Sequence, residues 1–155
     1  MALILDALLA EPKPYKRGFA MKLKGGCYCG EVRYVTEGDP AMKAQCHCRE
    51  CQYITGGSPN VFMAMPRAGF EYTQGEPKPF ARSDLDKPVT REFCATCGTH
   101  LVTLTPRLPD LVIVKVGGLD DPSVYGTPDV AIFTCDQQEY HRIPEGIPSF
   151  DKRPG

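Results

Sequence analysis

Polar and apolar positions along this chain alternate over short segments. The clearest case is EVRYVT, in which Val32, Tyr34 and Thr36 fall on one side of an extended chain. This alternation is typical of a half-buried β-strand. Further apolar runs bounded by Gly, Pro or Asp predict strands at residues 19–23, 61–65, 70–72, 80–83, 89–93, 101–105, 111–116 and 131–134. The pattern therefore predicts a mainly β protein built from short strands.

Helical signals are confined to two segments. Residues 49–54 suit a single helical turn, and residues 1–20, whose first ten are mainly apolar, suit either an amphipathic helical extension or a disordered or loosely docked tail. No repeat or low-complexity linker divides the remainder. We therefore expect one domain at residues 21–155 after an N-terminal extension at residues 1–20. The proline-spaced C-terminal end is expected to run extended over the surface without forming a central strand.

Charge and composition narrow the class of protein. The 155 residues include 18 basic and 19 acidic side chains, so nothing favours a nucleic-acid partner. The opening MALILDALLA is short, contains Asp6 and lacks a basic region, which disfavours a signal peptide and a membrane span. We therefore expect a cytoplasmic protein without a membrane partner. The 15 glycines and 15 prolines predict many turns and no long helix.

The eight cysteines add candidate chemistry. A reducing compartment disfavours structural disulfides, so metal binding or thiol chemistry is the main reason for so many thiols. Seven of them fall into three clusters: Cys27 and Cys29 in GGCYCGEVRY, Cys46, Cys48 and Cys51 in CHCRECQ, and Cys94 and Cys97 in FCATCGTH.

The first and third clusters, here called the quartet, each supply a pair of thiols. A C-x-x-C step followed by Gly98 brings two sulfurs together, because glycine can adopt a positive φ. In CYCG, both cysteines can face inward while Tyr28 faces out. Two such pairs predict a structural four-thiolate zinc site that connects the N-terminal strands to the hairpin at residues 89–105. Buried free thiols and a redox C-x-x-C are the alternatives.

The middle cluster, here called the trio, supplies only three ligands. Three protein ligands with an exchangeable fourth position are typical of a catalytic zinc site. The fourth ligand could be substrate, water, His47 or Cys135. We expect His47 to project away from the ion, since it lies between two ligands, and Cys135 to be a small buried hydrophobe in the apolar run AIFTC. The trio is therefore interpreted as the catalytic site.

Several residues around the trio are candidates for further roles. Thr55 and Gly56, in QYITGG, are expected either to contact substrate or to form a plain turn. His100 and His141 are expected on the surface or on a strand face.

A fourth thiolate would leave the site with a net charge of about −2, which calls for nearby cations or N–H donors. Lys43, Arg49 and the backbone near Gly56 and Gly57 are the candidates, with a solvated surface role as the alternative for the two side chains.

Taken together, these segments resemble a known family. GGCYCGEVRY, CHCRECQYITGG and REFCATCGTHL match, in order and spacing, the three motifs of the glutathione-dependent formaldehyde-activating (Gfa-like) enzymes, which include homologues of centromere protein V. VGGLDDP and EGIPSF are similar to the later, looser signatures of the family. The resemblance covers residues 25–150.

The resemblance implies a mostly β fold of small antiparallel sheets organised around zinc, similar to the β-tent, with two zinc ions per chain. The quartet would hold the structural ion and the trio the catalytic one. The implied reaction is that of a carbon–sulfur lyase, run in the direction that adds glutathione to formaldehyde to give S-hydroxymethylglutathione. The implied partner is thus a small-molecule thiol–aldehyde adduct. A binding or carrier module without turnover is the alternative.

Two positions depart from the family pattern. Ala131 and Tyr140 stand where the family usually has a histidine and a tryptophan, and the chain contains no tryptophan. The departures concern the choice of substrate and leave the cysteine motifs intact.

Overall fold

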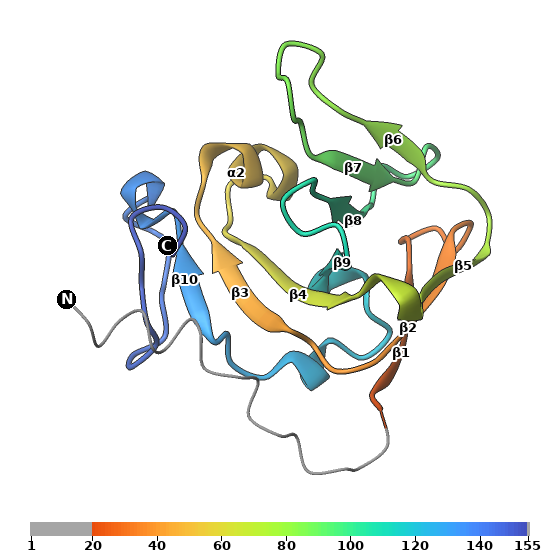
Figure 1. The fold of residues 1–155 in the computed structure, drawn as a ribbon, viewed down its shortest axis with the longest axis horizontal. Helices are drawn as coiled ribbons and strands as arrows, with labels where there is room; N and C mark the ends of the chain where they lie inside the picture. Colours follow the sequence, from red (N-terminus) through yellow and green to blue (C-terminus); the bar gives the residue numbers. More distant parts are fainter. Residues whose placement is uncertain (1–19, 155) are drawn as a thin grey trace.

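Two β-sheets form the part of the chain that the computed structural model describes, residues 20–154 (Figure 1). The smaller sheet has the order β1-β2-β5 and is antiparallel, with β1 at Lys22–Gly26, β2 at Arg33–Glu37 and β5 at Phe70–Gln74. The larger sheet has seven strands in the order β10-β3-β4-β9-β8-β7-β6. Its strands are β3 (Met42–Cys46), β4 (Asn60–Pro66), β6 (Lys78–Phe80), β7 (Thr90–Phe93), β8 (His100–Leu104), β9 (Leu111–Lys115) and β10 (Val130–Ile132).

Helices play a minor part in the described region. Its α-helix, α2 at Arg49–Thr55, follows β3 and confirms the helical turn expected there. Short 3₁₀ turns complete the connections: η1 (Arg67–Gly69), η2 (Val116–Gly118), η3 (Pro122–Tyr125) and η4 (Thr134–Asp136). No helix within residues 20–154 has the length and apolar character needed to cross a membrane. The extension expected at residues 1–20 lies outside the described residues apart from Ala20.

The prediction of a mainly β fold is confirmed, with one difference in strand direction. Every pairing between strands is antiparallel except that of β10 with β3, which is parallel and aligns Val130 with Ala44 and Ile132 with Cys46. A parallel neighbour needs a long crossover connection, and here β4 to β9 come between the two strands in the chain. Local patterning could not reveal this pairing.

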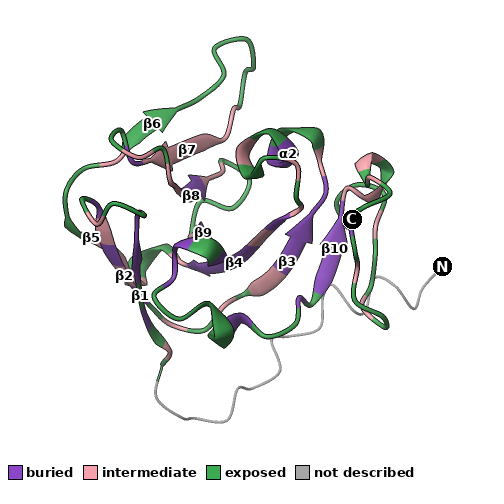
Figure 2. Cartoon of the chain, turned by 180° about the vertical axis from the view of Figure 1, so that it is seen from behind, coloured by how far each residue is buried: buried purple, intermediate pink, exposed green. Residues whose placement is uncertain are grey.

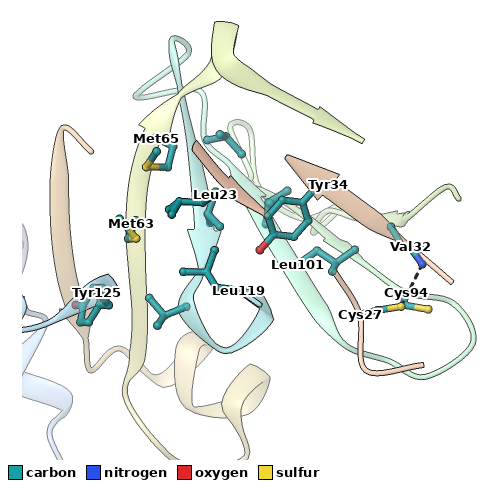
Figure 3. Close-up of a cluster of buried hydrophobic side chains, with 14 residues drawn as sticks. Leu23, Cys27, Val32, Tyr34, Met63, Met65, Cys94, Leu101, Leu119 and Tyr125 are labelled. Carbon is teal, nitrogen blue, oxygen red and sulfur yellow. Dashed lines mark hydrogen bonds between the residues drawn. The ribbon is translucent and has the colours of Figure 1, made fainter. Parts of the chain in front are cut away.

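The larger sheet contributes to two clusters of buried apolar side chains, and Figure 2 shows buried residues along β3, β4, β8 and β10. One face packs against the smaller sheet in a cluster that joins Met63 of β4 to Leu23 of β1 and Tyr34 of β2, with Cys27 and Cys94 at one end (Figure 3). The other face carries a second cluster: Ala44, Cys46, Cys51, Phe62, Ala64, Ile113, Val130 and Ile132. Each group of cysteines therefore adjoins a different core.

The two sheets meet where β1 passes η2. Gly25 forms an isolated bridge with Leu119, and the amide of Asp120 donates to the carbonyl of Lys24 at 2.9 Å. At the edge of the larger sheet formed by β10, the C-terminal segment runs beside that strand. The amide of Ala131 donates to the carbonyl of Pro148, and the amide of Phe150 donates to the carbonyl of Ala131. This segment forms no central strand, as predicted.

Candidate metal centres and an adjoining cavity

The quartet brings together two loops that are far apart in sequence. One loop follows β1 and holds Cys27 and Cys29, and the other joins β7 to β8 and holds Cys94 and Cys97. The four sulfurs all lie within 4.8 Å of one another. Cys29 Sγ is 3.5 Å from Cys27 Sγ and 3.8 Å from Cys94 Sγ. Sulfurs at about 2.3 Å from a zinc ion in a tetrahedron lie roughly 3.8 Å apart, so the donor set fits zinc.

Hydrogen bonds hold the quartet loops in place. The amide of Val32 donates to Cys27 Sγ at 3.2 Å, and the amide of Tyr28 donates to Thr99 Oγ1 at 3.0 Å across the two loops. The Thr99 hydroxyl, 3.1 Å from Cys97 Sγ, helps to lower the pKa of that thiol to about 5, because hydrogen bonding stabilises the thiolate.

The structure confirms the expected conformation of Gly98 and the expected outward position of Tyr28. Gly98 has φ 74°, as the C-x-x-C-G motif predicts. Tyr28 points outward and is 94% exposed. Cys27 is buried, but Cys29 is exposed, so the two sulfurs converge at the edge of the core and do not both enter it.

The trio is assembled at the junction of β3 and α2. Cys46 is the last residue of β3, Cys48 is the N-cap of α2, and Cys51 lies in its first turn. Because residues three apart on a helix share a face, Cys51 returns to the side of the cap. The three sulfurs lie within 4.8 Å of one another, and the Cys51 amide donates to Cys48 Sγ at 3.4 Å.

The trio favours at least one thiolate. Hydrogen bonds from the Cys46 and Cys51 thiols lower the pKa of Cys48 to about 2, whereas the same contact with Cys48 raises the pKa of Cys46. Cys46 and Cys51 are buried and Cys48 is half-buried. Three soft sulfur donors that converge in this way fit zinc or another thiophilic metal ion.

Neither protein candidate for a fourth ligand belongs to the trio cluster. Within residues 20–154, the three cysteines are the only His, Cys, Asp or Glu side chains that converge there. Cys135 lies in η4 and is exposed, so the expectation of a buried Cys135 is wrong. The 3₁₀ turn lifts it away from the apolar run that precedes it.

His47 points into a hydrogen-bonded pair of histidines. Its Nδ1 is 3.0 Å from His141 Nδ1, which also accepts from the amide of Gln138 at 3.2 Å. The proton of His141 is thus on Nε2, which donates to the carbonyl of Gly57 at 2.8 Å. His47 therefore donates through Nδ1, and burial, followed by the nearby charge of His141, lowers its pKa.

His141 is buried and lies outside the strands, which corrects the expectation that it would be on the surface or on a strand face. The loop after η4 folds back over the end of α2 and carries the ring inward. The histidine pair thereby ties the segment between two trio ligands to the turn at Gly57.

A cavity of about 200 Å³ opens at the C-terminal end of α2. Its lining comes from α2, β4, β8, β9 and η2: Ile54, Thr55, Pro59, Asn60, Val61, His100, Lys115 and Gly117. Asn60 lies directly opposite Cys46 in the β3/β4 register, which places the cavity next to the trio. Thr55 is in this lining, although its hydroxyl also donates to the Cys51 carbonyl at 3.0 Å.

Gly56 lies just outside the cavity lining. It ends α2 in the left-handed conformation, with φ 74°, and its N–H bonds to the carbonyl of Gln52. The amide of Gly57 donates to the same carbonyl at 2.7 Å. These two backbone donors are therefore engaged in ending the helix.

The sequence analysis calls for a cation near the trio, and Lys115 is the lysine that the structure places in the adjoining cavity. Its side chain is almost fully buried, and burial lowers the pKa of its amine to about 8, while the charge of the Cys51 thiolate opposes this shift. The two predicted cations are engaged elsewhere: Lys43 Nζ donates to the carbonyl of Tyr125 at 2.9 Å, and Arg49 bonds to Gln52. The sequence analysis missed Lys115, although a lysine that ends the apolar run LVIVK could have indicated it.

The family comparison agrees with this arrangement. The sequence profile described as glutathione-dependent formaldehyde-activating enzyme matches residues 22–136, which include the quartet and the trio. The chain belongs to this family. Its sequence has no match among curated proteins.

A solved structure shares the fold of this Gfa-family chain. The crystal structure of a Rhodobacter sphaeroides protein, a Northeast Structural Genomics target, superposes with a TM-score of 0.55 and 19% sequence identity. The match covers 68% of this chain and 97% of the other. At this level of identity, the likeness concerns the fold alone.

The two departures from the Gfa-family pattern lie near the trio. Ala131 is fully buried in β10 and pairs with Gln45, next to Cys46. Tyr140 is exposed, and its ring packs edge-on against His141 at a centroid distance of 4.8 Å. The first position is thus closed to solvent and the second is open to it.

Proposed function

We propose that this protein is a zinc-dependent carbon–sulfur lyase of the Gfa-like type, which handles a small thiol–aldehyde adduct such as S-hydroxymethylglutathione. Two ions per chain would be bound, one by the quartet and one by the trio. The quartet would be structural, because all four positions of a tetrahedron are filled by cysteine. The trio would be catalytic, and the proposed fold is the β-tent of that family.

The observation that carries the proposal is the position of the trio. Three convergent thiols, with no fourth protein ligand among residues 20–154, lie next to a cavity large enough for a small group. Sites of this kind bind substrate or water in the remaining position, whereas structural zinc sites are closed.

Zinc bound at the trio would supply Lewis acidity, which lowers the pKa of a thiol and polarises a carbonyl oxygen. In the direction of synthesis, the thiol sulfur forms a bond to the aldehyde carbon, the π electrons of the carbonyl pass to its oxygen, and that oxygen gains the proton that the thiol loses. The reverse reaction breaks the same carbon–sulfur bond.

The residues of this chain would bind and orient the reactants. The cationic Lys115 offsets the negative charge of the thiolates. The apolar Ile54, Pro59 and Val61 exclude water from the carbonyl carbon, and Thr55 remains the proposed polar contact at the end of α2. Excluding water strengthens each electrostatic interaction within the cavity.

A second candidate is a thiol-binding or carrier module without turnover. The same open trio would favour it, since holding a thiol and transferring it need the same three ligands. In either case we propose a cytoplasmic location, which is supported by eight cysteines that form no disulfide.

Metal content tests the first part of the proposal. We expect two zinc ions per chain in the purified protein and one in Cys46→Ser, because the substitution removes a trio ligand. Cys135→Ser is the matched control, and it should keep both ions since Cys135 is exposed and outside both clusters. Full zinc content in Cys46→Ser would contradict the trio as a metal site.

Turnover is tested by two-dimensional exchange NMR of formaldehyde, glutathione and their adduct. Substoichiometric protein should accelerate exchange above the spontaneous rate, and Cys46→Ser should abolish that acceleration. Thiol binding without acceleration would favour the carrier module, and the absence of thiol binding would contradict both candidates.

A further inference from the structure

We propose that the cavity beside the trio binds an anionic oxygen of the substrate, and that the Lys115 ammonium is the group that receives it. The inference rests on the proposed function, because it takes the trio as the site that holds the substrate sulfur. It adds the chemical class of the second group recognised: a carboxylate borne by a short thiol.

Lys115 places a largely buried cation in the wall of the cavity. The residue is only 7% exposed, and the thiol groups of the trio are the negative charges that favour its protonation. Its nearest aromatic contact is the ring of Phe62, whose centroid is 5.9 Å from Nζ. A largely buried ammonium is poorly hydrated, so an anion that reaches it gains a strong interaction.

The register of the larger sheet directs this amine toward the substrate. Lys115 lies opposite Phe62 on β4, and Asn60, two residues earlier on the same strand, lies opposite Cys46. Alternate residues of a strand share a face, so Cys46, Asn60, Phe62 and Lys115 lie on one side of the sheet. A ligand that bridges the trio and the cavity therefore meets Lys115.

His100 adds an unsatisfied polar group to the same cavity. Both of its ring nitrogens are buried, and neither has a hydrogen-bond partner within residues 20–154. Burial lowers the pKa of His100 to about 3, an effect increased by the positive charges of Lys115 and Arg91, so its ring is neutral. A neutral imidazole can donate one hydrogen bond to an anionic oxygen bound by Lys115.

The size of the cavity limits what it accepts. Its volume of about 200 Å³ is below the range of roughly 300–1,000 Å³ that is usual for drug-sized ligands. A group of a few heavy atoms fits, and the remainder of a larger thiol such as glutathione would extend outside. Among the lining residues, Lys115 is the one whose side chain carries a positive charge, since the His100 ring is neutral.

Comparing the binding of two small thiols tests whether the cavity prefers a carboxylate to a neutral oxygen. Mercaptoacetate and 2-mercaptoethanol both carry oxygen close to sulfur, but only mercaptoacetate carries a carboxylate. Binding of each to the zinc-loaded, full-length protein is measured by calorimetry at pH 7. We expect the wild-type protein to bind mercaptoacetate about 10-fold or more tightly than 2-mercaptoethanol, since hydrogen bonds to charged groups are the stronger ones.

The variant Lys115→Met assigns this preference to one side chain. It should weaken mercaptoacetate binding by about 10- to 100-fold and leave 2-mercaptoethanol binding unchanged. Lys43→Met is the matched control, since it removes a half-buried lysine outside the cavity, and both affinities should persist. Zinc content and melting temperature are measured alongside.

Three results would overturn the inference: equal affinity of the wild-type protein for both thiols, equal weakening of both by Lys115→Met, or no weakening of either. The first of these needs no variant, so it decides the matter even if Lys115→Met fails to fold. Because binding is the readout, a protein that binds mercaptoacetate selectively without turnover would contradict the proposed lyase activity and leave this inference standing.

Discussion

His100 is a half-buried residue whose two ring nitrogens are shielded from solvent, and its contribution to the stability of the fold depends on pH. Its pKa is about 3 in the folded protein, against an ordinary value of 6.5. Between these values the unfolded chain binds a proton that the folded protein does not, so stability falls as the pH falls from 6.5 toward 3. The contribution of one such group approaches about 1.4 kcal/mol per pH unit.

The variant His100→Gln should remove this contribution. Urea unfolding at pH 7.0, 6.0 and 5.5 would show a steeper loss of stability in the wild-type protein than in the variant. Acid effects on the cysteine clusters are common to both proteins and cancel in the comparison. Parallel pH profiles would mean that His100 is protonated in the folded protein.

At the residue scale, the spacing of the cysteines predicted both clusters, because short motifs determine which cysteines lie close together. Cys48 and Cys51 share one helical turn, and Gly98 supplies the positive φ that its loop needs. Lys115 and His100 carry no such motif. Their burial arises from the packing of β4, β8 and β9, which brings together residues that are distant in the chain.

At the scale of elements, Gly25 joins β1 to η2 and has no room for a side chain. A Cβ atom there would collide with the carbonyl oxygen of Gly118 and the ring of Tyr34. Gly25→Ala should therefore lower the free energy of unfolding by about 1–3 kcal/mol, the usual cost of overpacking. Gly117→Ala is the control, because a Cβ atom at Gly117 meets nothing within 4 Å.

Chemical denaturation of both glycine variants checks this expectation. Equal stability of Gly25→Ala and Gly117→Ala would show that the two sheets separate at this contact without cost.

Strands that follow an apolar pattern were predicted, and the strand that departs from it was not. Tyr34 and Thr36 of β2 and Val32 just before it are all buried, as the alternation in EVRYVT requires. β3 reads MKAQC, a mixture with polar residues, and was missed. It is a strand because β4 and β10 pair with it on both sides, which is a tertiary effect.

At the scale of the whole molecule, the quartet links the smaller sheet to the larger one. Cys27 and Cys29 follow β1, and Cys94 and Cys97 lie between β7 and β8. We expect Cys94→Ser to lose one metal ion and its cooperative thermal transition, since structural zinc contributes on the order of 10 kcal/mol to folding. Cys48→Ser should lose one ion and keep the transition, because the trio lies within one local segment.

Metal analysis and thermal circular dichroism of the two variants provide the check. A strong chelator should likewise abolish the transition of the wild-type protein only when the second ion leaves. Loss of the transition in Cys48→Ser, with retention in Cys94→Ser, would reverse the structural and catalytic roles proposed for the two clusters.

The two clusters also differ in the length of chain that separates their first and last ligands. The trio spans six consecutive residues, Cys46 to Cys51, whereas the quartet needs both ends of a segment from Cys27 to Cys97. Closing the longer loop costs more chain entropy. During synthesis, all three trio thiols are added to the chain before Cys94 and Cys97, so they meet the metal pool first, whereas β3, which ends in Cys46, gains its partner β10 only after the last quartet thiol has been added.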